Sequence, residues 1–595
     1  MSTAEAAWRR RFRAPQVSLP HAPPEAPQRC VYATSASGVW QLATWDLDTG
    51  RRRAITDKPT GVRSGGVTPD GAGVVWFDDG DGDEVGRYVL TPFEGGPRRD
   101  LLGPDVAEGW AAGLAQRPGR TVAGLADRDG FHVWVDDAAG LRRLDGFRHP
   151  LGVADLSPDA RLAAVEHAEH GDVLHPATRV YDAVDGRCLL DLGDANATLV
   201  PVAFSPLPGD TRLAVVGDHH GRLLPELVDV ATGQRRVLGA DLPGEVDLAD
   251  FWPDGRRVLL RAEHEGRSTL HALDLERDAL EPLEVGPGTV GAALVRPDGA
   301  VWYRFGSAAE PSQPRVRDRA GDRVLLAPEG EPAPAGSPYH ALRYPNDDGE
   351  EVHAFLALPE GPAPFPLVVE AHGGPAAHVS DHLDPYVQAW VDHGFAVLQP
   401  NYRGSTGYGK AWEERLIGDP GGPELVDLRC GRDHLVADGL ADPARVVLVG
   451  ASWGGYLTLL GLGTQPESWS LGVATVPVAD YLSAYRDESP DLQAYDRGLF
   501  GGSPEELPAL YRERSPLTHV GGVAAPVLII TGANDTRCPL PQVEGYVAAL
   551  AARGIDHHLD VFEAGHGSLA VEEQIRQQEL ALAFAAARLG TPGPR

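Results

Sequence analysis

The chain has 595 residues, several times the usual length of one domain, so at least two hydrophobic cores are expected. Hydrophobic residues make up 42% and charged residues 23% of it, values that exclude wholesale disorder and a bundle of membrane helices. The net charge of −32 repels phosphate backbones and anionic lipid heads, so we predict neither nucleic acid nor a membrane as a partner.

The four cysteines are far apart, and no Cys-x-x-Cys spacing suggests a zinc site or a disulfide framework. An arginine-rich N-terminus leads into a proline-rich stretch, Pro15 to Gln28, rather than into the apolar core of a signal peptide. No uncharged apolar run approaches the roughly 18 residues that span a bilayer. We therefore predict a cytoplasmic protein.

A short turn motif recurs through the first half of the chain. Its prolines are 40 to 49 residues apart, close to the period of a four-stranded propeller blade. The copies begin at Thr68, Arg117, Ser157, Ser205, Trp252 and Arg296. Most contain Pro-Asp or Pro-Gly, which favour tight hairpin connections. These six units, with Val31 to Thr56 as another, predict a β-propeller of about seven blades.

The sequence pattern changes near residue 330. Residues 325–338 are rich in Pro, Gly and Ala, and apolar runs then alternate with amphipathic stretches, as in a doubly wound, mostly parallel α/β sheet. We expect an N-terminal segment over residues 1–28, the propeller over 29–330 and an α/β-hydrolase domain over 331–595. The expected strands are Leu367 to Ala371, Ala396 to Gln399, Val446 to Val449, Leu471 to Ala474 and Val527 to Ile530.

The sequence around Ser452 reads Gly-Ala-Ser-Trp-Gly-Gly and follows the strand at Val446 to Val449. A nucleophile elbow requires this order of strand, cramped turn and helix, with small residues around the serine. An ordinary tight turn is the alternative. Asp535 and His566 follow Ser452 in the order of a hydrolase triad, each just after an expected strand. We therefore predict a catalytic Ser452, His566 and Asp535.

A tetrahedral intermediate needs fixed hydrogen-bond donors for its oxyanion. The turn His372 to Pro375 follows the strand Leu367 to Ala371, and its glycines permit close approach of the backbone. The Gly373 N–H and the Trp453 N–H are the expected donors.

Several motifs together resemble the prolyl oligopeptidase family of serine peptidases, and most closely its acylaminoacyl-peptidase branch. They are His372 to Pro375, Asn401 to Gly409, Gly450 to Gly455, Asp535 to Arg537 and Gly565 with His566. With the propeller repeats, the resemblance covers nearly the whole chain. It implies a cytosolic enzyme whose propeller restricts access to short peptides, an amphipathic segment, Ala4 to Arg13, packed on the hydrolase domain, and Arg537 beside the substrate pocket. Cys538 departs from the valine of many relatives.

Relatives that remove dipeptides hold a free α-ammonium with two adjacent glutamates from the propeller. No Glu-Glu pair occurs between Val31 and Glu329, where the nearest pattern is Glu263-His264-Glu265. We therefore favour substrates with blocked N-termini or longer peptides.

For Arg537 the alternative is a structural ion pair with a nearby acid.

The segment after the fourth expected strand carries several aromatic residues. Val478, Tyr481 and Tyr485 are candidate substrate-binding residues for an apolar or aromatic side chain, although core packing explains them equally well.

Two features suggest metal binding but have simpler explanations. The acidic run Asp78 to Glu84 lacks the ligand spacing of a calcium loop, so we interpret it as a solvated hairpin. The adjacent pair His219 and His220 would point to opposite faces of a strand. We predict no metal and no cofactor.

Three functions stay open at this stage. The first is a serine peptidase acting on short peptides or N-acylated amides through an acyl-enzyme, of acylaminoacyl-peptidase or oligopeptidase type, with a dipeptidyl or aminopeptidase variant. The second is a deacylase of a small N-acylated or ester metabolite, and the third is a propeller scaffold without catalysis. The complete triad disfavours the scaffold, but only the pocket distinguishes the first two. Whether the chain forms a homo-oligomer also stays open.

Overall fold

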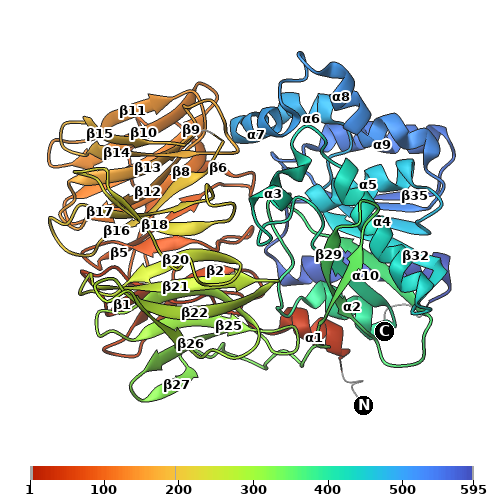
Figure 1. Ribbon diagram of the computed structural model, residues 1–595, viewed down its shortest axis with the longest axis horizontal. Helices are drawn as coiled ribbons and strands as arrows, with labels where there is room; N and C mark the ends of the chain where they lie inside the picture. Colours follow the sequence, from red (N-terminus) through yellow and green to blue (C-terminus); the bar gives the residue numbers. More distant parts are fainter. Residues whose placement is uncertain (1–4, 195, 592–595) are drawn as a thin grey trace.

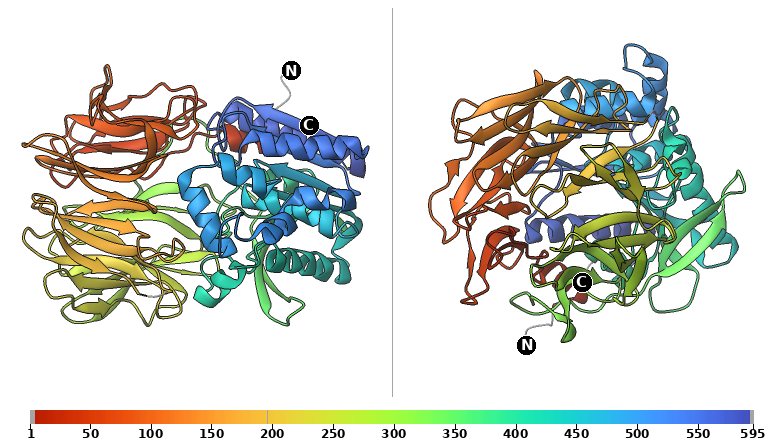
Figure 2. Two further views of the ribbon diagram at one scale, coloured as in Figure 1. Left: turned by 90° about the horizontal axis from the view of Figure 1, so that it is seen from above. Right: turned by 60° about the vertical axis from the view of Figure 1, so that its left-hand side comes forward.

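The computed structural model describes residues 5–194 and 196–591. Antiparallel sheets form one half of the molecule, and a sheet layered with helices forms the other (Figure 1). The two halves lie side by side in the views of Figure 2. Of the predicted N-terminal segment Ala4 to Arg13, Ala4 lies outside the described residues. Among the described residues, no helix is long and apolar enough to cross a membrane.

The first half is a β-propeller built from 27 strands in chain order. Their bounds are β1 (Arg29–Thr34), β2 (Gln41–Asp46), β3 (Arg52–Ala54), β4 (Gly65–Val67), β5 (Gly73–Asp78), β6 (Val85–Pro92), β7 (Arg99–Asp100), β8 (Gly109–Arg117), β9 (Arg120–Asp127), β10 (Gly130–Asp137), β11 (Arg142–Phe147), β12 (Leu151–Leu156), β13 (Leu162–His167), β14 (Ala177–Asp182), β15 (Cys188–Leu192), β16 (Leu199–Phe204), β17 (Arg212–Gly217), β18 (Leu224–Asp229), β19 (Arg235–Val237), β20 (Glu245–Phe251), β21 (Arg257–His264), β22 (Arg267–Asp274), β23 (Ala279–Leu283), β24 (Thr289–Val295), β25 (Val301–Gly306), β26 (Gln313–Asp318) and β27 (Gly321–Val324).

The recurrent turn motif connects neighbouring strands of the propeller. Between β4 and β5, the Asp70 carboxylate accepts hydrogen bonds from the Thr68 hydroxyl (2.6 Å) and the Ala72 N–H (3.0 Å), and Gly71 has a φ of 69°. The carboxylate closes the turn and glycine takes its left-handed position, which is the turn chemistry that the sequence indicates.

The predicted count of seven blades is not matched. Five sheets of three or four strands stand as separate blades, whereas β4 to β11 form one eight-stranded sheet. The reason is a short pairing between β6 and β8, where Val85 and Gly86 face Trp110 and Gly109. This pairing joins strands that the repeat pattern assigns to two separate blades.

The second half contains an eight-stranded sheet in the order β28-β29-β31-β30-β32-β33-β34-β35, parallel from β31 onward. Its strands include every one that the sequence predicts. Their bounds are β28 (His340–Pro345), β29 (Glu351–Ala357), β30 (Phe365–Ala371), β31 (Ala396–Pro400), β32 (Ala441–Ala451), β33 (Leu471–Thr475), β34 (Val527–Gly532) and β35 (His557–Phe562). The strand order reverses at β30, and ligands of open α/β sheets bind at such a switch point.

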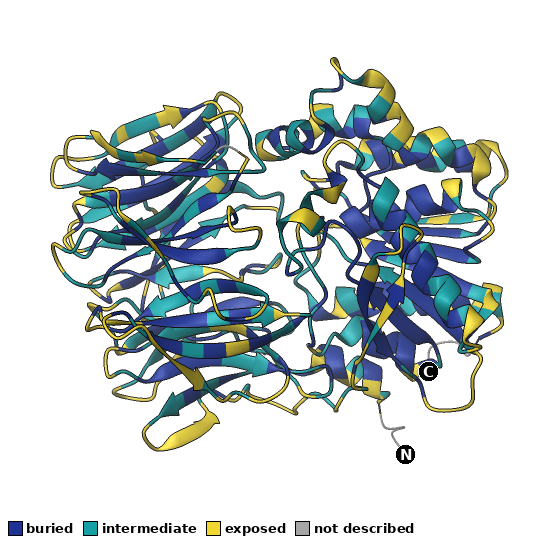
Figure 3. Cartoon of the chain, in the orientation of Figure 1, coloured by how far each residue is buried: buried dark blue, intermediate teal, exposed yellow. Residues whose placement is uncertain are grey.

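Helices cover both faces of this sheet (Figure 1). They are α2 (Pro385–Asp392), α3 (Lys410–Glu413), α4 (Gly422–Ala437), α5 (Trp453–Thr464), α6 (Tyr481–Asp487), α7 (Pro490–Phe500), α8 (Pro508–Arg514), α9 (Leu540–Ala552) and α10 (Val571–Leu589), with short 3₁₀ turns at Glu414–Leu416 and Pro516–Gly522. Along β32, Val446 and Leu448 belong to one buried core and Val447 to the other. Side chains of a strand alternate between faces, so a strand covered on both sides is apolar throughout, as the dark central strands of Figure 3 show.

The N-terminal helix α1 (Ala7–Arg13) lies against α2 and α10. Trp8 and Phe12 are buried in the same core as those two helices, and the Arg11 guanidinium donates to the Asp392 carboxylate at 2.6 Å. Although α1 precedes the propeller in the chain, its apolar face is therefore buried on the α/β half.

Candidate active site

Ser452 occupies a sharp turn between β32 and α5. Its φ of 55° and ψ of −119° lie outside the regions that a non-glycine residue ordinarily adopts. The flanking residues have to be small, because a Cβ at Gly450 would collide with the Gly454 backbone and one at Gly454 with the Ala371 carbonyl. This is the strained, crowded turn that presents a serine hydroxyl at the edge of a sheet.

The three residues of the predicted triad lie within hydrogen-bond distance in series. The Ser452 Oγ is 2.9 Å from the His566 Nε2, and the His566 Nδ1 is 2.8 Å from the Asp535 Oδ2. The other Asp535 oxygen accepts the backbone N–H groups of Arg537 and Cys538, both at 2.9 Å. The Asp535 side chain is fully buried and that of His566 is 14% exposed. The carboxylate is thus held rigidly while the imidazole can reach a substrate.

Backbone donors lie close to the Ser452 hydroxyl. A Cβ placed on Gly373 would be 3.6 Å from the Ser452 Cβ, so the turn after β30 contacts the elbow. Trp453 is the first residue of α5, and the N–H groups of a first helical turn have no intrahelical acceptor. The structure therefore brings Gly373 into contact with Ser452, which Trp453 follows in the chain.

His372 holds the glycine turn in place. Its Nδ1 lies 2.8 Å from the Gly373 carbonyl oxygen, its Nε2 lies 2.8 Å from the Ser405 hydroxyl, and its ring stacks on Tyr402 at 4.1 Å. Burial lowers the pKa of His372 to about 4, so the ring is neutral at physiological pH.

The acidic run of the propeller reaches the same loops. The Thr536 hydroxyl donates to the Asp83 carbonyl at 2.9 Å, and the Arg537 guanidinium donates to both Glu84 oxygens at 2.9 and 2.6 Å. The Gly82 carbonyl lies so close to Gly565 that no side chain would fit there. The predicted hairpin is present between β5 and β6, and Gly80 and Asp81 are exposed, but residues 82–84 are only partly solvated because the folded chain places them against the loops of Asp535 and His566.

Two carboxylates and one guanidinium meet beside Asp535. Burial raises the pKa of Asp491, on α7, to about 6, and the charge of Glu84 adds to the shift. Burial also raises the pKa of the Cys538 thiol well above its ordinary value, so this neighbour of Asp535 stays protonated.

The candidate pocket residues lie farther into the core. Val478 is 9% and Tyr481 2% exposed, and Tyr481 packs against Tyr456 and Phe500. Tyr485 accepts a hydrogen bond from Arg497 at 2.7 Å. None of the three candidates lines the cavity that opens beyond the Gly373 turn, whose wall instead includes Tyr495 of α7. Their role in substrate binding stays a prediction.

The argument against a metal at His219 and His220 does not hold. The two rings lie together, with centroids 4.1 Å apart, and the His219 Nε2 is 2.9 Å from Glu226. The pair lies in the turn between β17 and β18, where the alternation of a strand does not apply. Arg235 also donates to Glu226, at 2.8 Å, and thereby neutralises the carboxylate that a cation would need.

The sequence indicated Tyr495 only as one of several aromatic residues in a stretch where core packing is an equal alternative, and it did not indicate Glu84. Glu84 is the last acid of the run that begins at Asp78, and Tyr495 belongs to an aromatic helix. Nothing local distinguishes either residue from a surface or core residue, because both reach the site through the contact between the two halves.

The sheet and the elbow together define the class of this protein, an α/β-hydrolase with an added β-propeller. Residues 381–591 match the model of the prolyl oligopeptidase family, and this match together with the named peptidase relatives supports a serine peptidase. The matched region contains Ser452, Asp535 and His566, whereas Gly373 lies before it.

Among the proteins similar to this chain are two enzymes and one solved structure. The dipeptidyl aminopeptidase BIII of Pseudoxanthomonas mexicana is 28% identical over 565 residues, which cover 89% of this chain and 80% of that protein. The acylamino-acid-releasing enzyme of Rattus norvegicus is 28% identical over 391 residues. The match covers 60% of this chain and about half (52%) of that enzyme. A puromycin-hydrolyzing peptidase of Mycobacterium tuberculosis has the same fold, with a TM-score of 0.85 at 23% identity over 100% of this chain and 97% of the other.

Proposed function

We propose that the chain hydrolyses amide bonds of short peptides through an acyl-enzyme, in the manner of an acylaminoacyl peptidase or oligopeptidase. The carrying observation is the hydrogen-bonded series from Ser452 through His566 to Asp535 at a strained elbow. The Ser452 Oγ attacks the carbonyl carbon while the His566 Nε2 accepts its proton. His566 then gives that proton to the departing amine. Water releases the acyl group by the same steps, returning the proton to Ser452.

The oxyanion formed in each step is stabilised by the Gly373 and Trp453 N–H groups. The helical position of Trp453 and the contact between Gly373 and Ser452 support this assignment. Backbone donors held by β30, α5 and the stacked His372 need no reorganisation as charge develops.

The substrate class is tested by profiling the purified enzyme. Acetyl-aminoacyl, free aminoacyl and dipeptidyl chromogenic amides are compared, each with and without a fluorophosphonate. Preference for acetylated substrates supports the acylaminoacyl type, whereas failure on all peptide amides with turnover of small esters or metabolite amides supports a deacylase.

A second candidate is an aminopeptidase or dipeptidyl peptidase. The observation that favours it is the position of Glu84, an acid bonded to Arg537 beside the triad loops, with Asp491 close enough for the charge of Glu84 to raise its pKa. Such acids suit a free α-ammonium, and one relative is named a dipeptidyl aminopeptidase. Faster hydrolysis of free aminoacyl or dipeptidyl amides than of acetylated ones would favour this candidate.

We expect the propeller to exclude large substrates. The propeller contacts the loops of Asp535 and His566, and the backbone of Ala570, four residues after His566, pairs with Val39. Peptides of a few residues should be cleaved while denatured casein survives, as followed by gel electrophoresis and mass spectrometry. Rapid digestion of casein by homogeneous enzyme would contradict a size filter.

Arg537 is proposed to bind a carbonyl or carboxylate of the substrate, with Glu84 holding it in place. Arg537→Ala should lower kcat/KM for acetyl-aminoacyl amides by about 10- to 100-fold, while the melting temperature barely moves, because the pair is half exposed (51% and 36%). Glu84→Gln frees the guanidinium and should cost far less. Equal losses of melting temperature in both variants, with kcat/KM unchanged, would assign the pair to structure alone.

We further propose the division into residues 1–28, 29–330 and 331–595 and a cytoplasmic location. All four cysteines are free, as a reducing compartment allows.

A further inference from the structure

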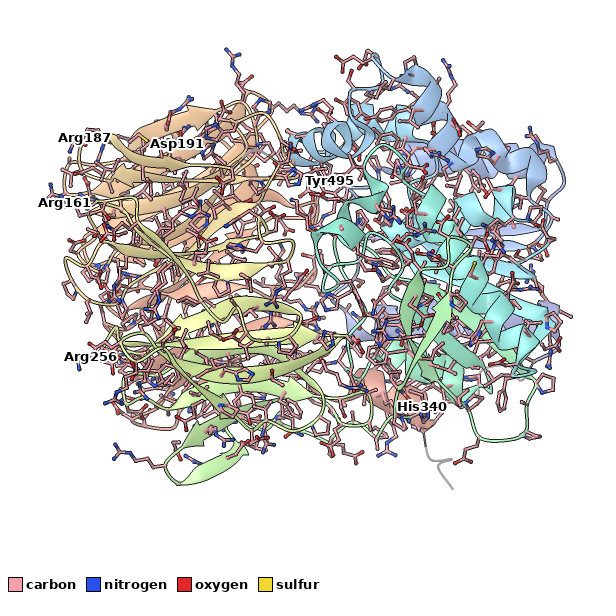
Figure 4. The ribbon with its side chains drawn as sticks, viewed as in Figure 1. Arg161, Arg187, Asp191, Arg256, His340 and Tyr495 are labelled. Atoms are coloured by element: carbon pink, nitrogen blue, oxygen red, sulfur yellow. The ribbon has the colours of Figure 1, made fainter. Side chains whose placement is uncertain are left out.

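A cavity of about 290 Å³ lies between the propeller and the α/β half, directly beyond the Gly373 turn. Pro375 and Ala376, which follow that turn, form one wall. Leu174 of the propeller and Tyr495 and Leu499 of α7 form others. Figure 4 shows Tyr495 on the side of the α/β half that faces the propeller. The volume is at the lower end for ligand sites and suits one side chain or one amino terminus.

The only ammonium group that lines this cavity is already paired. Lys410 is one of two lysines in the chain, and its Nζ is 2.7 Å from the Asp218 carboxylate and 2.7 Å from that of Glu414. His175 lies between the carboxylates of Asp172 (2.6 Å) and Glu414 (2.7 Å). These contacts pair Lys410 and His175 with carboxylates, and acidic side chains outnumber basic ones around the cavity.

Glu413 also lines the cavity, and its carboxylate makes no hydrogen bond or ion pair with any residue in the described part of the chain. Burial raises its pKa to about 7, the charges of Glu245, Asp218 and Glu414 add to the shift, and Lys410 opposes it. Tyr495 faces it from α7. Glu413 is therefore a half-buried carboxylic acid, close to other acids, with no cationic partner in the described part of the chain.

The position of the cavity relates it to a substrate. If the scissile carbonyl oxygen accepts the Gly373 N–H, the carbon next to that carbonyl lies beside Pro375. That carbon carries two substituents, a side chain and an amino nitrogen. Either can project into a cavity that begins at Pro375 and Ala376.

We propose that this cavity binds a positively charged group of the substrate, an ammonium or guanidinium, and that Glu413 is the residue that pairs with it. The proposal rests on the proposed function, because it takes Ser452 as the point of attack. The charge belongs either to a basic side chain at the scissile bond or to the free α-amino group.

Three p-nitroanilides separate the two sources. N-acetyl-lysine and N-acetyl-norleucine anilides differ in the side-chain charge, and norleucine anilide with and without the acetyl group differs in the α-amino charge. In the pair that carries the charge at the position the cavity binds, the charged anilide should have a kcat/KM at least about tenfold higher than the neutral anilide. Hydrogen bonds to charged groups contribute about that much.

Glu413→Gln should reduce that ratio to near 1 while leaving kcat/KM for N-acetyl-norleucine anilide within about twofold. The matched control is Glu544→Gln, the same change at an exposed position on α9, which should leave both ratios intact. Ratios that are unchanged in Glu413→Gln, or near 1 in the wild type, would overturn the proposal.

The ratio should also depend on pH. For the N-acetyl-lysine pair, whose side-chain ammonium keeps its charge over this range, Glu413 is ionised above a pKa of about 7, so the ratio should rise between pH 6 and pH 8. Glu413→Gln should show no such rise, and a rise that persists there would assign it to another group.

A binding measurement separates this proposal from the proposed function. Butylammonium should bind the wild type by calorimetry and bind Glu413→Gln at least about tenfold more weakly, whereas butanol should bind neither. Fluorophosphonate labelling with unchanged ratios and no butylammonium binding would reject the cation site alone. No labelling and no turnover, with butylammonium bound, would reject the proposed function alone.

Discussion

Ser452→Ala should lower kcat for a good peptide amide by about 10⁴-fold or more and abolish labelling by a fluorophosphonate. The variant lacks the hydroxyl oxygen 2.9 Å from the His566 Nε2, the proposed nucleophile, while the proposed oxyanion donors at Gly373 and Trp453 are unchanged. Alanine keeps the Cβ of Ser452, so the backbone of the strained turn is unchanged and the melting temperature should barely move. The measurements are steady-state kinetics, mass spectrometry of the labelled protein and thermal unfolding.

Ser64→Ala is the matched control, since Ser64 is exposed on the propeller and should leave kcat unchanged. Covalent labelling that persists in Ser452→Ala would show that another serine is the nucleophile.

Asp535→Asn should lower kcat by about 10⁴-fold, although it changes the side chain by little more than its charge. One Asp535 oxygen accepts two backbone N–H groups, so an asparagine would place its carbonyl there and its NH₂ toward the His566 Nδ1. The Nδ1 would then have to accept, leaving the proton on the Nε2, and the ring could no longer take the proton of Ser452. The measurement is kcat together with the melting temperature.

Asp487→Asn, an exposed change on α6, serves as the control for charge. A folded Asp535→Asn enzyme that keeps more than about a tenth of the wild-type kcat would contradict the role of Asp535.

The order of strands and helices in the α/β half could be predicted from the sequence because each element has its own local residue pattern. A strand buried on both faces must be apolar throughout, as at Val446 to Val449, and the elbow at Ser452 must have glycine at Gly450 and Gly454. The Pro-Asp-Gly turns predict the propeller for the same reason, since the side chain of Asp70 closes its own turn. Such constraints act within a few residues.

The number of separate blades could not be predicted from the sequence. It depends on one pairing of β6 with β8, between residues more than twenty positions apart. The two residues at Val85 and Gly86 carry no signal that they hydrogen-bond to the next blade.

By itself, the sequence determined the two folds, the order of Ser452, Asp535 and His566, and the two glycine-rich turns, because these follow from local backbone and burial requirements. Only the tertiary structure decided that Glu84 pairs with Arg537, that Tyr481 is buried in the core, and that Glu413 lines a cavity with no hydrogen-bond or ion-pair partner among the described residues. Tyr481 is buried by contacts within the α/β half, whereas the first and third outcomes depend on how the propeller meets the α/β half. Such a contact joins residues hundreds of positions apart, so no local pattern encodes it.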